Sequence, residues 1–212
     1  MQDIESFKLK MNRICAFAID LFIVLILSSM VSNVYKANPY MYDYEDTYKA
    51  FTEANSDISK KKEISSLEDL EVMVKPLYNL QKVQTYEYLW FIAFLIFYFV
   101  IFQYLNDGQT LGKKISKIKV VSAKDENKRP NIFQFLLHTI FCGSSFYNGF
   151  HLMVLLNVIA LLTLNILNYF LAYTVIVMLG FGLELASYIV FFTNKENKGL
   201  NDMISGVKTI NL

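Results

Sequence analysis

The sequence predicts an all-α polytopic membrane protein with about four transmembrane helices, a small cytoplasmic β-ribbon and an interfacial helix. Hydrophobic residues make up 54% of the 212 residues, more than a soluble domain of this length needs. They are concentrated in three blocks, at 15–35, 88–105 and 150–192. Because about 20 apolar residues cross the hydrocarbon core of a bilayer, the first two blocks each predict one span and the third predicts two.

A single membrane domain is expected to cover 1–212. Its predicted spans are 15–34, 88–105, 149–167 and 170–192, with a tight outward turn at "LNILNY" between the last two. The first apolar block follows Lys8, Lys10 and Arg13, as the core of a secretory signal would. It is longer than the ~7–15 residues of a signal core, so we interpret it as a retained span.

The distribution of lysine and arginine predicts the orientation. The segment 107–129 carries seven basic and three acidic residues, whereas 36–87 carries seven lysines and ten acids. Basic residues near spans favour the cytoplasmic side. We therefore expect 106–148, a loop with the interfacial helix, and the tail 193–212 in the cytoplasm, and 35–87 outside. Both termini are then cytoplasmic; a five-span arrangement is the alternative and would place the tail outside.

The long outward loop predicts a small helical cap. Ser65 or Ser66, followed three residues later by Glu68 or Asp69, has the form of a capping box. Leucines and valines then recur at helical spacing, and Pro76 is expected to bend or split that helix. The alternative interpretation of the loop is a docking surface for a partner or peptide.

The stretch "YLNDGQTLGKKISKIKVV" looks at first like a phosphate-binding loop. Such a loop needs four residues between its glycines and a hydroxyl after its lysine. Here Gly108 and Gly112 are separated by three residues, and Lys114 stands at the hydroxyl position. Instead, Asp107 and Gly108 predict a turn at the end of a helix. Lys113, Lys114 and Lys117 are expected at the inner membrane surface, where each gains ~1 kcal/mol from anionic lipid.

Two short segments on this side of the membrane alternate in polarity. "KIKVV" follows the lysines, and "GVKTINL" ends the chain. Such alternation is typical of strands, whose backbone groups need partners. We predict that 117–122 pairs with 207–212.

Three motifs occur in a fixed order along the chain: "NRICAFAID", "GQTLGKKISKIKVV" and "GLNDMISGVKTI". In this order they resemble the RDD family of bacterial integral membrane proteins, with Arg13, Asp20 and Asp202 at the family's Arg-Asp-Asp positions. Two positions depart from the family pattern, because His138 stands where an arginine is common and Asn201 where a histidine is frequent. The resemblance implies a bacterial cell (plasma) membrane. It implies no single activity, since some members are described as sodium–proton antiporters and others as accessory or regulatory proteins.

The charges inside the apolar blocks indicate candidate sites. Arg13 and Asp20 share one helix face but lie ~10 Å apart along its axis, too far to pair. Asp20 and Glu184 lie within predicted spans, where a charge costs ~2.5–3.5 kcal/mol, so both are candidate cation or proton sites. The alternative is that they only tie helices together by hydrogen bonds. Asp202 is expected to cap a short helix and to pair with Arg13, as structural or gating charges.

These features favour a function at the membrane. A net charge of +1 provides no field for nucleic acid. Neither histidine has a serine or cysteine partner in sequence, so we expect no enzyme activity, no catalytic residues, no metal and no cofactor. The expected function is movement of cations, protons or another small solute, with the lipid bilayer and the solute as partners. The alternative is a non-transporting regulatory, inhibitory or immunity partner of another membrane protein.

Overall fold

Long apolar helices dominate the computed structural model, which describes residues 2–32, 43–58, 66–142 and 151–212. By length and composition, three helical stretches can cross a membrane. They are α1 (Gln2–Ser32), α8 (Ile166–Thr193), and α3 (Leu67–Ile96) with its continuation through a π-helical turn (Phe97–Phe102) and α4 (Gln103–Leu105). The predicted all-α membrane fold is confirmed.

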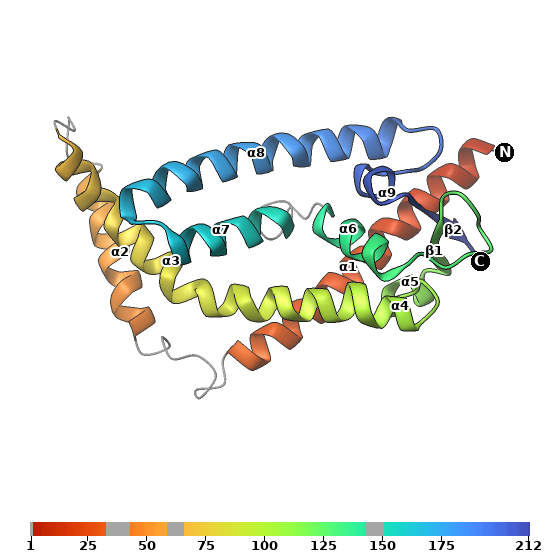
Figure 1. Ribbon diagram of the computed structural model, residues 1–212, viewed down its shortest axis with the longest axis horizontal. Coiled ribbons are helices and arrows are strands. Elements are labelled where there is room, and N and C mark those ends of the chain that lie inside the picture. The colour runs from red at the N-terminus through yellow and green to blue at the C-terminus, as the bar shows by residue number, and fades with distance from the viewer. Residues whose placement is uncertain (1, 33–42, 59–65, 143–150) are drawn as a thin grey trace.

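The long helices lie lengthwise, with both chain termini at one end of the molecule (Figure 1). At the opposite end, α2 (Tyr44–Ile58) packs on the first half of α3. Between the long helices lie α6 (Ile132–Ile140) and the apolar α7 (His151–Thr163). With 13 residues, α7 is shorter than the expected span 149–167, so the number of crossings stays a prediction.

The ends of these helices follow from capping residues. Ser66 precedes α3 and accepts a hydrogen bond from the backbone nitrogen of Asp69 at 3.1 Å, which confirms the predicted helix start. The turn at "LNILNY" is also present, because Asn165 caps α8 by accepting from the nitrogen of Asn168 at 3.0 Å. Pro76 does not split its helix, since α3 continues through it. The alternative expectation, a bend at Pro76, stays a prediction.

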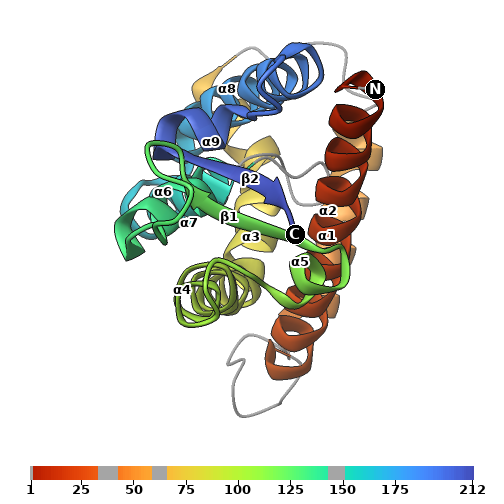
Figure 2. The same ribbon diagram turned by 90° about the vertical axis from the view of Figure 1, so that its right-hand side faces the viewer.

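A two-stranded antiparallel sheet lies at the end that carries the termini. It joins β1 (Ile118–Ser122) to β2 (Val207–Asn211), with Ile118 opposite Asn211. The predicted pairing of these segments is confirmed. Figure 2 shows the sheet crossing this end, with α1 and α5 (Leu111–Ile115) at one side and α6 and α9 (Leu200–Ser205) at the other. The sheet therefore folds the tail back and brings α9 to α1.

A small apolar core fixes the sheet in this position. Val120 and Val207 are fully buried, one from each strand, and pack with Val100 and Phe135 from the helices. Since Phe135 lies at the centre of this core, α6 is anchored in the protein and not only at an interface. Its start is fixed by a capping box, in which Asn131 and Gln134 each accept from the other's backbone nitrogen.

Candidate functional site

Asp20 lies on the inner face of α1 and is fully buried. Its Oδ1 accepts hydrogen bonds from the hydroxyl of Tyr98 and from the backbone nitrogen of Gly112, both at 2.7 Å. Its Oδ2 accepts from the hydroxyl of Thr110. The carboxylate that the sequence placed in an apolar span is thus held by donors from two other segments, the π-helical turn after α3 and the loop into α5.

The two glycines of the stretch "YLNDGQTLGKKISKIKVV" position this loop. A Cβ at Gly112 would lie 2.2 Å from the carbonyl oxygen of Ala16, so only glycine lets α5 approach α1 this closely. Gly108 has a φ of +82°, as the predicted turn requires, and a Cβ there would lie 2.2 Å from the carbonyl oxygen of Val120. The backbone N–H of Gly112, which a phosphate loop would offer to a nucleotide, is used by Asp20.

Lys113 is not an exposed side chain, so the expectation that it contacts anionic lipid is wrong. Its side chain is buried, with Nζ 4.0 Å from Oδ2 of Asp20 and 3.3 Å from Oε1 of Gln103. Burial lowers the pKa of Lys113, and the charge of Asp20 opposes that shift. Successive residues of a helix point about 100° apart, so its neighbour Lys114 is exposed, as is Lys117. For these two lysines the membrane-surface role stays a prediction.

Arg13 and Asp202 form the predicted clasp between α1 and the tail. Nη2 of Arg13 lies 2.5 Å from Oδ2 of Asp202, and Nη1 donates to the carbonyl of Asn197. Nε2 of His138 lies 3.0 Å from the other oxygen of Asp202. Asp202 also accepts from the backbone nitrogen of Gly199 at 2.8 Å. It therefore helps to cap α9, but from the third position inside the helix, since the N-cap residue is Gly199 and not the aspartate as expected.

The pKa of Asp202 reflects these contacts. Burial raises it, but the charge of Arg13 and the hydrogen bond from His138 outweigh burial and lower the pKa to about 2. His138 replaces the arginine that the sequence motif leads us to expect, and it still reaches Asp202. The departure therefore exchanges a permanent charge for a side chain that can be neutral at pH 7.

We call this group of side chains the charged cluster. It consists of Arg13, Asp20, Lys113, His138 and Asp202. Asp20 and Asp202 each carry one negative charge, and Arg13 and protonated Lys113 each carry one positive charge. The cluster therefore has no net charge when His138 is neutral. Its members come from α1, α5, α6 and α9, which the sheet holds together at the end that carries the termini (Figure 2).

A second set of buried polar side chains contains no charge. The hydroxyl of Tyr169 donates to Asn157 at 3.0 Å, Nδ2 of Asn157 to Gln81 at 3.3 Å, and the hydroxyl of Tyr88 to Gln81 at 3.4 Å. We call these four residues the neutral cluster; it joins α3, α7 and α8. The sequence analysis did not find this cluster; the available signal was that Gln81 and Tyr88 lie two turns apart on one face of α3.

Glu184 does not join Asp20. It is half-buried on α8, and its carboxylate accepts from the hydroxyl of Tyr188, one turn later on the same helix, at 3.0 Å. Within the described part of the chain, the groups recorded in contact with Asp20 come from the π-helical turn and the α5 region. The role of Glu184 as a cation or proton site stays a prediction, separate from Asp20.

Comparison with known proteins adds one match. The sequence model described as RDD family matches residues 9–206, a range that includes the charged cluster and β1. No curated protein and no solved structure matches the chain. In the described ranges, no group of three or more histidine, cysteine, aspartate or glutamate residues could hold a metal ion.

Proposed function

Because the chain belongs to the RDD family, we propose that this membrane protein exchanges a cation for protons and that Asp20 and Lys113 form the exchange site. The observation that carries the proposal is a buried Lys113–Asp20 pair at 4.0 Å within a domain of apolar helices. Ionisable groups at membrane depth are costly, and they commonly mark ion or proton pathways. A buried ion pair also adds little stability compared with apolar packing, which favours a role in function.

The surroundings of the pair suit a change of charge. Gln103 offers Lys113 a neutral acceptor at 3.3 Å, so the amine keeps a hydrogen bond when it loses its proton. Asp20 has three donors besides Lys113, which hold its carboxylate in place throughout. A cation or proton that neutralises Asp20 would remove the charge that favours protonated Lys113. Binding of the cation and release of the proton are thereby coupled.

We further propose four crossings in a bacterial plasma membrane, with both termini in the cytoplasm. The two termini lie at one end of the molecule, which supports an even number of crossings (Figure 1). α6 has 9 residues and α7 has 13. At 1.5 Å per residue the two together extend about 33 Å, close to the ~30 Å of a hydrocarbon core. The third crossing is then a helix broken between α6 and α7.

The test is ion flux in liposomes that contain the purified protein and a trapped pH-sensitive dye. Sodium and potassium gradients are imposed in turn, and proton movement is recorded at several external pH values. We expect proton movement that depends on a cation gradient. Lys113→Ala should reduce its rate at least tenfold, because the exchange site loses its base.

Lys114→Ala is the matched control, since this exposed lysine is the next residue of the same helix. It should keep the wild-type rate. Equal rates for the two variants would contradict the proposal, and no flux in the wild-type protein under any gradient would favour a role without transport.

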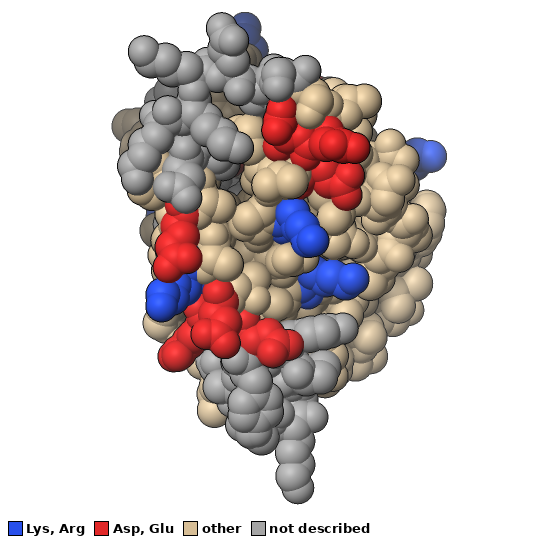
Figure 3. Space-filling view, turned by 90° about the vertical axis from the view of Figure 1, so that its left-hand side faces the viewer, with Lys and Arg blue, Asp and Glu red and all other residues tan. Residues whose placement is uncertain are grey.

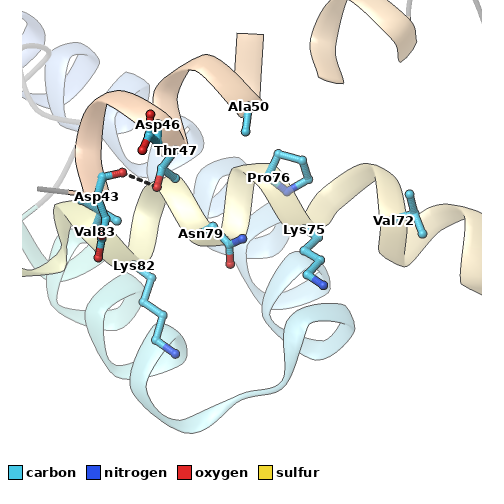
Figure 4. Close-up of a pocket in the computed structure, with 10 residues that line it drawn as sticks. All are labelled: Asp43, Asp46, Thr47, Ala50, Val72, Lys75, Pro76, Asn79, Lys82 and Val83. Carbon is cyan, nitrogen blue, oxygen red and sulfur yellow. Dashed lines mark hydrogen bonds between the residues drawn. The ribbon is translucent and has the colours of Figure 1, made fainter. Parts of the chain in front are cut away.

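One feature favours such a role, as a regulatory, inhibitory or immunity partner of another membrane protein. At the end opposite the termini, a cavity of about 660 Å³ opens between α2 and α3. Figure 3 shows side chains of both charges gathered on this end. Asp43 and Asp46 line the cavity from the α2 side, and Lys75 and Lys82 from α3 (Figure 4). Charges of both signs around a hollow suit a polar protein segment.

This second function is tested by placing a photo-crosslinking amino acid at Asn79 in the cavity and, as control, at Leu171 on α8. Crosslinking in native membranes should give one defined membrane-protein adduct from Asn79 and not from Leu171. The adduct should disappear when Lys75 and Lys82 are both changed to Glu. Persistence of the adduct in that variant would contradict docking through the cavity.

A further inference from the structure

The break between α6 and α7 is held together by His151. Nδ1 of His151 lies 2.8 Å from the carbonyl oxygen of Thr139 in the last turn of α6. The backbone nitrogen of His151 donates to the carbonyl of Cys142 at 3.4 Å. The last carbonyls of a helix lack partners within the helix; that of Thr139 also accepts from the backbone nitrogen of Cys142 at 3.1 Å, so Nδ1 of His151 is its second donor. The first residue of α7 therefore caps the end of α6.

The contact with Thr139 fixes the protonation of the ring. A carbonyl oxygen only accepts hydrogen bonds, so Nδ1 must carry the hydrogen. In a neutral imidazole the other nitrogen then has a free lone pair. Nε2 of His151 is consequently an acceptor and a base, placed at the junction of two half-helices.

This base is buried without a partner. His151 is 6% exposed and Thr139 is 3% exposed. Neither Nε2 of His151 nor Oγ1 of Thr139 has a hydrogen-bond partner among the residues that the structure describes. Buried polar atoms are nearly always hydrogen-bonded, to protein or to ordered water, and leaving one unsatisfied costs about 1–3 kcal/mol.

We propose that Nε2 of His151, beside the end of α6, is a proton-binding site, which binds a buried water and takes up an excess proton that reaches this water as hydronium. The hydroxyl of Thr139 is the second ligand of that water. In the proton transfer a hydronium ion gives its proton to Nε2 and becomes water, while the ring becomes an imidazolium that keeps its Nδ1 bond to Thr139. The reverse step returns the proton to water.

The site lies between the two polar clusters. On α6, His138 of the charged cluster directly precedes Thr139. On α7, Asn157 of the neutral cluster lies six residues after His151. Along α3, the apolar Phe91 packs its ring against His151, with ring centroids 6.0 Å apart. His151 thus places one basic atom in the apolar stretch beyond the charged cluster, where a relay for the proposed proton exchange would lie.

Few other groups can compete for a proton here. The titratable side chains that the described contacts bring to α7 are all tyrosines. Tyr88 of α3 lies beside Val154, Tyr169 of α8 is bonded to Asn157, and Tyr78 and Tyr173 pack against the cluster of Ala160, Leu161 and Tyr169. α6 adds His138, and Cys142 follows the end of α6. Tyrosine and cysteine keep their protons below pH 8 when buried, and Nε2 of His138 is engaged with Asp202. Among these groups, His151 is therefore the base whose nitrogen has no partner in the described part of the chain.

A spectroscopic test reads the site directly. The chain contains two histidines, so ¹⁵N-histidine labelling gives two ring systems, and His138→Gln leaves His151 as the only one. We expect the Nδ1–H tautomer at neutral pH, an exchange signal between Nε2 and water, and a protonated Nε2 on acidification. An Nε2–H tautomer, or an Nε2 that neither exchanges with water nor titrates while the protein stays folded, would overturn the proposal.

A variant separates the base from the cap. In His151→Asn the amide nitrogen can take the place of Nδ1 and bond to Thr139, but no counterpart of Nε2 remains. We expect this variant to fold as the wild-type protein does and to lose proton flux at least tenfold. Wild-type flux in His151→Asn would contradict the relay. This inference rests on the proposed proton exchange, but the spectroscopic test does not: if the wild-type protein shows no flux, the tautomer and water exchange alone decide whether the proton site exists.

Discussion

The charged cluster and the neutral cluster differ in how their buried polar side chains obtain partners. Both bury polar side chains between apolar helices, where every polar group needs a partner. The charged cluster joins Asp20 to Lys113 and Arg13 to Asp202, across segments that are far apart in sequence. The neutral cluster uses only amides and hydroxyls, from Gln81 through Asn157 to Tyr169.

The difference concerns what each cluster can do. Amide and hydroxyl hydrogen bonds between membrane helices are worth about 0.6 kcal/mol on average, and they do not change charge near pH 7. A buried ion pair changes the charge of the site when one partner binds or loses a proton, and it leaves an expensive uncompensated charge when one partner is removed. Hydrogen bonding between helices accounts for the neutral cluster, whereas the proposed proton exchange rests on the charged cluster.

The largest effect is expected from breaking the clasp in the charged cluster. Arg13→Ala leaves the buried carboxylate of Asp202 without its cation, and should destabilise the protein by about 3–5 kcal/mol. Thermal unfolding in detergent measures the loss. Lys198→Ala, which removes an exposed ion pair with Glu196, is the control and should cost at most ~1 kcal/mol. Similar losses for the two variants would erase the distinction between buried and exposed charge.

Acid should weaken the charged cluster selectively. Asp202 has a folded pKa of about 2 against an ordinary value of 3.8. A lowered carboxylate pKa stabilises the fold above the ordinary value, and that stability is lost as pH falls from there through the folded pKa. The difference corresponds to about 2 kcal/mol.

Between pH 5 and pH 2 the wild-type protein should therefore lose stability. The free energy of unfolding of Asp202→Asn should fall by about 2 kcal/mol less over the same range. Identical pH profiles for the variant and the wild-type protein would mean that Asp202 is not held as an anion.

The close approach of α5 to α1 can be tested by one methyl group. Gly112→Ala places a Cβ against Ala16 and the carboxylate of Asp20, and should cost about 1–3 kcal/mol through overpacking. Gly182→Ala is the matched control, because no atom lies within 4 Å of its new Cβ. The account requires a measurable difference in melting temperature between these two variants.

The smallest effect is expected in the neutral cluster. Tyr169→Phe removes one hydroxyl from Asn157 and should lower stability by about 0.5–2 kcal/mol without altering flux. The measurement is unfolding in detergent alongside transport in liposomes. A loss as large as that of Arg13→Ala would show that the two clusters do not differ in kind.

The sequence predicts one half of the charged cluster better than the other. The pairing of the two strands and the Arg13–Asp202 clasp were both predictable, because alternation marks the strands and the sheet carries Asp202 towards α1. The burial of Lys113 was not, since four lysines occur within seven residues and nothing in their spacing singles one out. The available signal was Thr110, which caps α5 and thereby sets the direction in which Lys113 points.

The neutral cluster was hidden for a different reason. Glutamine and asparagine are mostly exposed in proteins, so the residue types of the cluster do not by themselves mark buried partners. The sequence marks Glu184 as a candidate site on the same grounds as Asp20, but the recorded partner of Glu184 lies on its own helix. Only the packing of helices separates the two acids.

The most direct test of the proposed role of Asp20 in proton exchange is cation-driven proton flux. It is measured in Asp20→Asn and in Tyr169→Phe, each reconstituted at equal density in liposomes. Asp20→Asn preserves the size of the side chain and removes the charge opposite Lys113, while Tyr169→Phe perturbs only the neutral cluster. We expect the rate of proton flux in Asp20→Asn to be at least tenfold below that of the wild-type protein, and the rate in Tyr169→Phe to be unchanged. Wild-type flux in folded Asp20→Asn would contradict the proposed role of Asp20.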